Sequence, residues 1–220
     1  MSRDRRQTKK TRGMPQPPGL DGIQVVGIVV IALVIGAIGW MVLSSGEAAP
    51  TPGRWSAPPA MNLDPGRQYS ATVKMAKGGE FTIELRVDQA PITVNNFVFL
   101  AREGYFDGVT FHRVLEGFMA QGGDPTGSGG GGPGYQFANE DSDLLFDVAG
   151  VVAMANAGRD TNGSQFFITF GPQPQLNGDY TIFGQVTAGM DVVNGLKRRD
   201  PDQNPDFAGD VIESVTIAER

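Results

Sequence analysis

Residues 111–124 have the sequence Phe111-His112-Arg113-Val114-Leu115-Glu116-Gly117-Phe118-Met119-Ala120-Gln121-Gly122-Gly123-Asp124, in which one arginine lies among apolar side chains. The apolar residues on either side of Glu116-Gly117 predict two short strands joined by a turn. Arg113 falls inside the first strand, and its guanidinium cannot lose its proton, so unpaired burial would be costly. A lone arginine of this kind usually reaches solvent or forms an ion pair. The alternative is a functional cation, and the rest of the chain must distinguish the two.

Two later stretches give residues 111–124 a recognisable context. They are Met154-Ala155-Asn156-Ala157-Gly158 and Thr161-Asn162-Gly163-Ser164-Gln165-Phe166-Phe167-Ile168. In sequence and in order, the three stretches resemble the signature blocks of the cyclophilins, which are peptidyl-prolyl cis-trans isomerases. The resemblance runs from about residue 69 to residue 218. It favours the functional interpretation of Arg113.

Composition excludes several other chemistries. The 220 residues suffice for one domain of about 150 residues with additional segments. The chain has no cysteine and one histidine, which rules out disulfides, thiol catalysis and zinc sites built from cysteine or several histidines. Residues 1–22 carry six Lys or Arg and two Asp, so the net charge of −6 leaves −10 on the remainder. This acidic remainder argues against nucleic acid as a partner.

The N-terminal part of the chain predicts a membrane anchor. Residues 23–43 are 21 residues in which only Gln24 is strongly polar. As a helix they would span about 31 Å, close to the hydrocarbon thickness of a bilayer. The basic arm, residues 1–22, precedes them, so we expect a cytoplasmic N-terminus and an extracytoplasmic catalytic domain, held in the cell membrane by a single-pass helix. A cleaved signal peptide is the alternative, although its apolar region is usually only about 7–15 residues long.

The remainder predicts a linker and one β-rich domain. Residues 44–66 contain five prolines, which favour an extended linker. In residues 67–220, alternating apolar residues predict about eight strands, and Pro91 and Met190 begin two helical patterns. Strands and helices do not alternate, which favours a closed antiparallel barrel. The resemblance implies the same fold: a mainly β, eight-stranded cyclophilin-like barrel capped by two α-helices, here preceded by one transmembrane helix.

Three other features have simpler interpretations than their motifs suggest. Residues 127–132 match a dinucleotide-binding pattern, but Pro133-Gly134 prevents the helix that this fingerprint requires, so we expect a mobile loop. Asn162-Gly163-Ser164 is formally a glycosylation acceptor, and we expect a structural turn instead. His112 could be a catalytic base, but the sequence has no Gly-x-Ser-x-Gly nucleophile motif and no further metal ligands to accompany it. We therefore expect His112 to be a packing residue.

Isomerisation of an X-Pro bond requires an unusual site. The barrier of about 18–20 kcal/mol comes from amide resonance, so the reaction needs no nucleophile, metal or cofactor. The enzyme must instead bind the twisted bond more tightly than either planar form. When resonance breaks, the imide nitrogen gains a lone pair, which a fixed cationic donor can stabilise. The resemblance places Arg113 in this role.

The resemblance also implies the residues around Arg113. It gives catalytic roles to Phe118 and Gln121, and no cofactor or metal. The substrate-binding residues that it implies are Met119, Ala155, Asn156, Ala157, Gln165, Phe167, Leu176 and Tyr180. Among these, an apolar proline pocket would be formed by Phe118, Met119, Phe167 and Leu176. Apolarity alone would favour ordinary core positions for most of the pocket residues.

Two positions depart from the best-known eukaryotic cyclophilins. Gln175 stands where they carry a tryptophan before the leucine, and Tyr180 stands where they carry a histidine. Both departures resemble bacterial members and put cyclosporin sensitivity in doubt.

We therefore expect a membrane-tethered prolyl isomerase with a monomeric catalytic domain. Its partners would be proline-containing polypeptides, namely exported or envelope proteins whose folding it assists, and the membrane through residues 23–43. The alternative is a membrane-tethered chaperone or scaffold that binds proline-containing peptides and isomerises them only incidentally.

Overall fold

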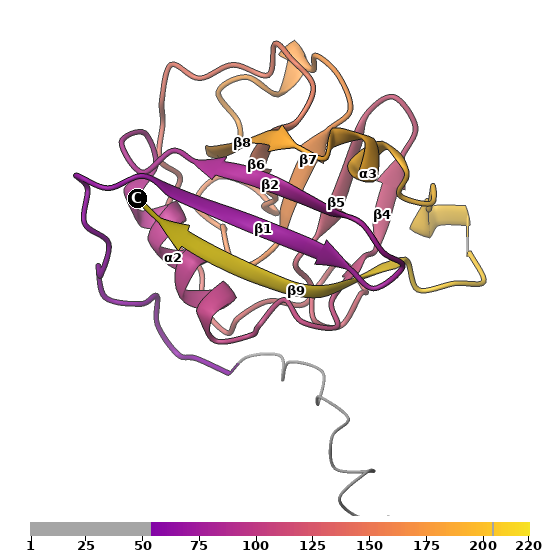
Figure 1. The fold of residues 1–220 in the computed structure, drawn as a ribbon, viewed down its shortest axis with the longest axis horizontal. Helices are drawn as coiled ribbons and strands as arrows, with labels where there is room; N and C mark the ends of the chain where they lie inside the picture. Colours follow the sequence, from indigo (N-terminus) through magenta and orange to yellow (C-terminus); the bar gives the residue numbers. More distant parts are fainter. Residues whose placement is uncertain (1–53, 204) are drawn as a thin grey trace, which may run out of the picture. The chain divides into compact units, whose positions relative to one another are not determined.

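The computed structural model describes residues 54–203 and 205–220, and Figure 1 shows them as a strand-rich barrel with two α-helices. The predicted basic arm and transmembrane helix lie outside these residues. Within the described residues, no helix is both long and apolar enough to cross a bilayer. The described strands are β1 (Tyr69–Met75), β2 (Glu80–Leu85), β3 (Thr110–Phe111), β4 (Arg113–Leu115), β5 (Met119–Gly122), β6 (Val151–Met154), β7 (Phe166–Thr169), β8 (Ile182–Ala188) and β9 (Asp210–Glu219). The helices are α2 (Pro91–Arg102) and α3 (Met190–Asn194), with 3-10 turns η1 (Pro174–Leu176) and η2 (Pro201–Gln203).

The strands form one antiparallel sheet that nearly closes on itself. Its order is β3-β9-β1-β2-β8-β6-β7-β5-β4. Thr110, on the first strand of this order, forms an isolated bridge with Asp124, which follows β5 near the other end. The two ends of the sheet therefore meet. The prediction of a mainly β antiparallel barrel is confirmed in this nearly closed form.

The strand count was wrong by one, because residues 110–115 change pairing partner at His112. Before it, β3 pairs with β9, and after it, β4 pairs with β5. On the edge of β4 that faces away from β5, Val114 exchanges backbone hydrogen bonds of 2.7 and 2.9 Å with Arg199. The Arg199 guanidinium also donates to the His112 carbonyl. The single predicted strand is thus two short strands, and nine strands lie in the described part of the chain.

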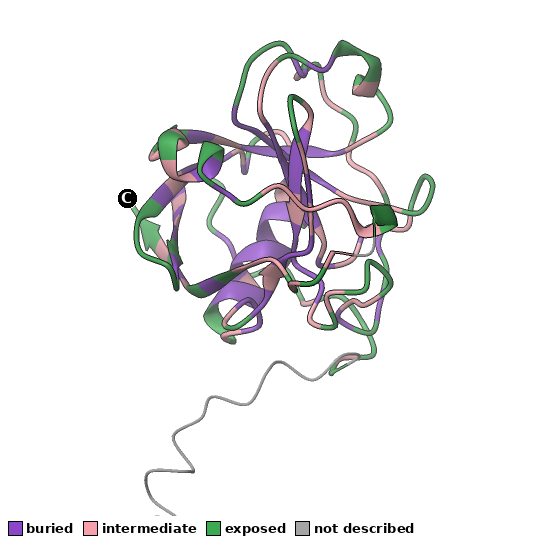
Figure 2. Cartoon of the chain, turned by 90° about the vertical axis from the view of Figure 1, so that its right-hand side faces the viewer, coloured by how far each residue is buried: buried purple, intermediate pink, exposed green. Residues whose placement is uncertain are grey.

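Apolar residues fill the barrel. Figure 2 shows the buried segments in the strands and in the longer helix. In β1, Tyr69, Ala71, Val73 and Met75 are buried, and the residues between them are more exposed. Phe166 of β7 lies at the centre of an aromatic cluster, with its ring centroid 5.6–6.0 Å from three other rings. The interior is therefore a packed core and offers no channel for a ligand.

The two helices lie at separate ends of the barrel (Figure 1) and pack against different strands, α2 against β9 and α3 against β2. Pro91 begins α2, which has no side-chain cap of its own. Glu140, from a distant loop, supplies the cap instead: its carboxylate accepts from the N–H groups of Ile92 at 2.9 Å and Thr93 at 2.7 Å. The predicted apolar face of α2 is buried, including Val94 and Phe97.

Part of the predicted linker packs on the domain. Residues 54–66 lie within the compact unit, and Leu63 is only 8% exposed in its core. The Asp64 N–H donates to the Tyr69 hydroxyl at 3.0 Å. The remainder of the predicted linker, residues 44–53, lies outside the described residues.

Candidate active site

A row of residues crosses four neighbouring strands, β4, β5, β7 and β6. The register pairs Arg113 with Gln121, Gln121 with Phe167, and Phe167 with Ala153. Directly opposed residues project to the same face of a sheet. Phe166, the next residue along β7, belongs to the barrel core, so this row faces outward. The fold thus brings Arg113, Gln121 and Phe167, three of the predicted site residues, to one face.

This outward face carries its own apolar cluster, separate from the barrel core. Its buried members are Met119, Phe146, Val151, Ala153, Phe167 and Ile182. The partly buried residues packed against it are Leu115, Phe118, Leu144, Ala155, Leu176 and Tyr180. All four predicted proline-pocket residues are therefore in one cluster. Met119 and Phe167 are as buried as core residues and Phe118 and Leu176 are partly buried, yet none of the four belongs to the barrel core.

Two aromatic contacts fix Phe167 within this cluster. The Phe146 ring is stacked at 5.8 Å, and the Tyr180 ring meets Phe167 edge-on at 5.4 Å, with an interplanar angle of 87°. Such pairs stabilise by roughly 0.5–1.5 kcal/mol beyond their buried area. Tyr180 thus forms an aromatic wall, and Leu176 reaches the same cluster from η1.

Arg113 is half-buried and, within residues 54–203 and 205–220, forms no ion pair. By contrast, Arg198, close to the same β4–β5 turn, pairs with Glu116 at 2.5 Å. A structural arginine at a partly buried position would normally have such a partner. The geometry therefore favours the functional interpretation of Arg113 over the ion-pair alternative.

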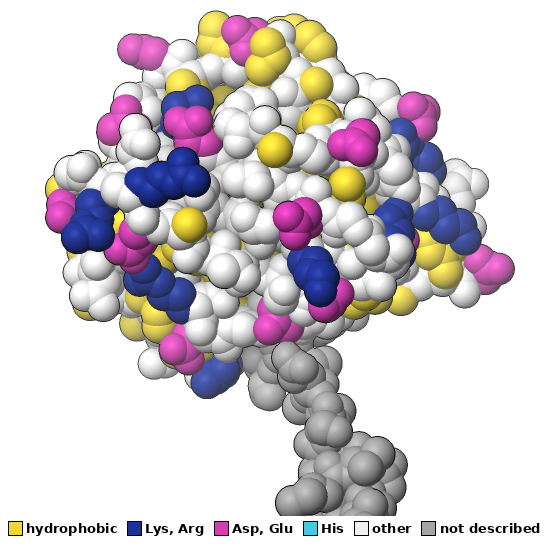
Figure 3. Space-filling view, viewed as in Figure 1, with side chains coloured by type: hydrophobic (Ala, Val, Ile, Leu, Met, Phe, Trp, Pro, Cys, Tyr) yellow, Lys and Arg dark blue, Asp and Glu magenta, His cyan; other side chains and the backbone are white. Residues whose placement is uncertain are grey.

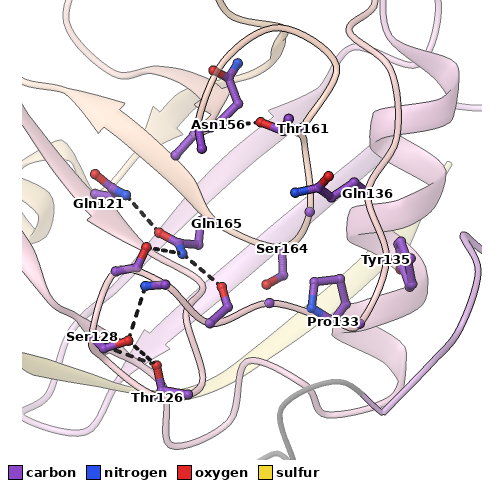
Figure 4. Close-up of a pocket in the computed structure, with 18 residues that line it drawn as sticks. Gln121, Thr126, Ser128, Pro133, Tyr135, Gln136, Asn156, Thr161, Ser164 and Gln165 are labelled. Atoms are coloured by element: carbon purple, nitrogen blue, oxygen red, sulfur yellow. Dashed lines mark hydrogen bonds between the residues drawn. The ribbon is translucent and has the colours of Figure 1, made fainter.

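Two glutamines, Gln121 and Gln165, connect this face to the glycine-rich loop of residues 127–134 (Figure 4). Gln121 Nε2 donates to Gln165 Oε1 at 2.9 Å. Gln165 Nε2 in turn donates to the carbonyls of Gly129 at 3.0 Å and Gly131 at 2.9 Å. This bond fixes the Gln121 amide, and among residues 54–203 and 205–220 no hydrogen bond uses the Gln121 side-chain oxygen, which can therefore accept one.

Asp124 organises the glycine-rich loop from beneath. Its buried carboxylate accepts hydrogen bonds from the Thr126 N–H and hydroxyl, both at 2.7 Å, and from the N–H groups of Gly129 at 2.6 Å and Gly131 at 3.1 Å. Burial alone would raise the pKa of Asp124, but the hydrogen bonds from Thr126 and these two glycines hold it below its ordinary value. The predicted mobile loop therefore has a specific set of hydrogen bonds. The signal for it was present in the sequence, because aspartate two residues before threonine is typical of a side-chain-stabilised turn.

The loop forms one wall of a groove of about 1020 Å³. Five predicted site residues line this groove: Gln121, Ala155, Asn156, Ala157 and Gln165. Residues that the sequence did not predict as site residues also line it: Thr126 and residues 128–136 on the loop side, and Thr161, Gly163 and Ser164 on the other. Arg113 and the proline-pocket residues are not among its lining residues. The predicted site thus has two adjoining parts, the groove and the apolar face. Ala155 belongs to both, and Gln121 lines the groove from its place between Arg113 and Phe167 in the row.

Asn156 lies at the edge of the groove with its main chain available. Its side chain donates to the Asp179 carbonyl at 3.4 Å and accepts from the Gly158 N–H at 3.2 Å. Within the described part of the chain, no hydrogen bond uses the Asn156 backbone N–H or carbonyl. An extended peptide could therefore pair with it, as a strand pairs with a sheet edge.

His112 and Asn162 have structural positions. His112 is 2% exposed; burial lowers the pKa of its imidazole, with Arg199 and Arg113 acting in the same direction against Asp124. Asn162 is fully buried, and its amide donates to Asn139 Oδ1 at 3.0 Å, so its side chain is closed to glycosyl transfer. Both residues have structural positions in this fold, although Asn162 lies in an isolated bridge with Phe137 and not in the expected turn.

Known proteins resemble this chain in sequence and in fold. The family model described as "Cyclophilin type peptidyl-prolyl cis-trans isomerase/CLD" matches residues 71–218. Peptidyl-prolyl cis-trans isomerase ppi1 of Schizosaccharomyces pombe is 49% identical over 145 residues, which cover 63% of this chain and 94% of that protein. Peptidyl-prolyl cis-trans isomerase B of Bacillus subtilis is also 49% identical, over 124 residues, or 56% of this chain and 87% of the relative.

A solved structure agrees with these sequence matches. It is the crystal structure of a cyclophilin-type peptidyl-prolyl cis-trans isomerase of Cryptosporidium parvum in the presence of the dipeptide Ala-Pro. The two chains are 36% identical and superpose with a TM-score of 0.63, covering 69% of this chain and 99% of the other. The fold, the match of residues 71–218 and the sequence identities lead to one conclusion: this chain belongs to the cyclophilin-type peptidyl-prolyl cis-trans isomerase family.

Proposed function

We propose that the protein accelerates rotation about X-Pro bonds in exported or envelope proteins, with Arg113 as the catalytic cation. The observation that carries this proposal is the half-buried Arg113, without an ion pair among the described residues, in one cross-strand row with Gln121 and Phe167. The neighbouring apolar cluster would hold the proline ring. The uncommitted guanidinium would then donate to the imide nitrogen once that nitrogen becomes pyramidal.

Rotation would occur between two fixed ends of the substrate. The proline ring would rest on Phe118, Met119 and Phe167, whose packing against Tyr180 and Phe146 leaves them little freedom. The residues before proline would lie in the groove, with the peptide main chain paired to Asn156. The small side chains of Ala155 and Ala157 leave room there for a substrate side chain. Gln121, held by Gln165, would offer its carbonyl oxygen to a peptide N–H.

An isomerase and a passive peptide-binding protein would differ in a single experiment. We expect the full chain to accelerate cis-trans exchange of an Ala-Pro peptide, measured by exchange NMR at catalytic protein concentration. The chaperone or scaffold alternative predicts binding with no change in exchange rate. A variant of an exposed residue outside the site, Asp147→Asn, serves as a control and should match the wild type.

We further propose that the protein is a bacterial-type member, with a monomeric catalytic domain tethered outside the membrane. The support is in the sequence: the basic arm at 1–22, the apolar stretch at 23–43, and the departures at Gln175 and Tyr180. In addition, acidic and basic side chains are interspersed on the face shown in Figure 3, which offers nucleic acid no continuous basic surface there.

Protease added to intact cells should distinguish this topology from the alternatives. We expect loss of the domain and survival of residues 1–22, detected with one tag at each end of the chain. Protection of an uncleaved domain would contradict the proposed orientation. A secreted form that begins near residue 49 would show that a signal peptide had been removed.

A further inference from the structure

The segment before the first strand is attached to the back of the groove. Residues 54–63 precede the family match, which begins at residue 71. They pack along α2, where the Asn95 side chain accepts from the Asn62 N–H at 3.0 Å and donates to the Ala60 carbonyl at 3.1 Å. The segment therefore has specific polar contacts in addition to the buried Leu63.

Trp55 is the aromatic anchor of this segment. Its ring meets the Phe99 ring edge-on at 5.3 Å and lies 5.7 Å from the Tyr105 ring. The Arg54 guanidinium covers the indole at 4.8 Å. The backbone N–H of Trp55 donates to the Pro133 carbonyl at 3.0 Å. Trp55 thus connects α2, and Tyr105 three residues beyond its end, to the end of the glycine-rich loop.

Two residues that Trp55 contacts, Pro133 and Tyr105, connect it to opposite sides of the groove. Pro133 is a lining residue, and it abuts the opposite wall so closely that a Cβ on Gly163 would lie 3.2 Å from its ring. On the other side, the Tyr105 hydroxyl and Ser164 Oγ are 3.1 Å apart, and Ser164 Oγ donates to the Gly123 carbonyl at 2.7 Å. Trp55 therefore contacts Pro133, on the loop side of the groove, directly. It supports Ser164, on the opposite side, through the buried Tyr105.

The loop needs a second fixed point because of its composition. Residues 127–134 contain six glycines, and glycine loses more conformational entropy on ordering than any other residue. Asp124 binds the part of the loop up to Gly131. Beyond it, the Trp55 N–H holds the Pro133 carbonyl. Without this second point, a bound peptide would have to order the wall itself and would bind more weakly.

We propose that Trp55 is a positioning residue for the groove. It holds Pro133 at the distance from the opposite side of the groove that lets the substrate residues before proline bind. This proposal rests on the proposed function of the groove as the peptide site. It makes the segment before the family domain part of the substrate-binding machinery. Its effect should appear in KM, because Trp55 touches neither the reacting bond nor Arg113.

Three variants of the full chain test this role. We expect Trp55→Ala, which keeps the backbone N–H but removes the ring that fixes its position, to raise KM for an Ala-Pro peptide about three- to tenfold, with kcat within about twofold of the wild type. Trp55→Phe keeps a ring against Phe99 and Tyr105 and should restore most of the affinity. Leu63→Ala is the matched control: it removes a buried side chain from the same segment without touching the groove.

The outcomes separate positioning from simple stability. Melting temperature and amide hydrogen exchange at Gly132, Gly134 and Tyr135 are measured on all three variants, and faster exchange in Trp55→Ala alone supports the proposal. An unchanged KM in folded Trp55→Ala overturns it, and so does an equal rise in KM in Leu63→Ala. If the wild type proves inactive, the proposed function fails, whereas the exchange measurement still decides whether Trp55 holds the wall.

Discussion

Replacement of Arg113 with alanine is expected to lower kcat/KM for X-Pro isomerisation by about 100- to 1000-fold, the usual effect of losing one preorganised donor to a transition state. The guanidinium would meet a lone pair on the imide nitrogen only when that bond is twisted. Peptide affinity, which reflects the planar forms, should therefore change little, and the loss should appear in kcat. Line-shape NMR of a proline peptide gives both quantities in one titration.

Two further variants define the Arg113 result. Arg113→Lys retains the charge but loses the planar donor pair and its reach, so it should also be severely impaired. Arg86→Ala removes a partly exposed arginine that pairs with Glu84 outside the site, and should leave turnover unchanged.

The melting temperature distinguishes catalysis from structure at Arg113. Since no ion pair holds it in the described residues, Arg113→Ala breaks no buried charge pair and should melt within a few degrees of the wild type. Near-normal turnover in a folded Arg113→Ala protein would refute the catalytic role. A large fall in melting temperature would instead favour a structural arginine.

Replacement of Asp124 with asparagine is expected to destabilise the domain by about 2–4 kcal/mol, because a buried acceptor that receives several hydrogen bonds becomes partly a donor. One amide group would then face N–H or O–H donors that it cannot satisfy, either at Thr126 or at Gly129 and Gly131. For a domain of this size, the expected fall in melting temperature is roughly 5–15 °C. Peptide affinity should fall with it, since the same loop lines the groove.

The Asp124 contribution should also depend on pH in a defined direction. The folded protein holds the pKa of Asp124 below its ordinary value, so the carboxylate stabilises the fold above the unfolded pKa of about 3.9. This stabilisation is lost as the pH falls through the lower, folded pKa. The difference in unfolding free energy between wild type and Asp124→Asn should therefore be full at pH 7 and narrow below about pH 4.

Urea unfolding at several pH values between 7 and 3 measures this difference. Asp147→Asn, at an exposed position, provides the matched control and should follow the wild type throughout. A difference for Asp124→Asn that stays constant with pH would mean that the carboxylate charge is not what holds the loop.

The sequence by itself determined the elements whose residues repeat locally. Alternation in residues 69–75 predicted β1, and the spacing of Val94 and Phe97 predicted the buried face of α2, because burial of one face imposes a period on the neighbouring residues. The short blocks around Arg113 and Gln165 indicated the family and the residues that meet at the site. Their order along the chain was enough, since each block keeps its own local spacing.

Only the tertiary structure decided the contacts between distant segments that have no period. The division of residues 110–115 into two strands depends on Arg199, which lies 87 positions along the chain from His112 and donates a hydrogen bond to its carbonyl. Glu140 caps α2 from 47 positions away, and Trp55 reaches Pro133 across the fold. Each contact joins single residues whose own neighbours give no sign of the partner, and its stability depends on the folded barrel holding both at hydrogen-bonding distance.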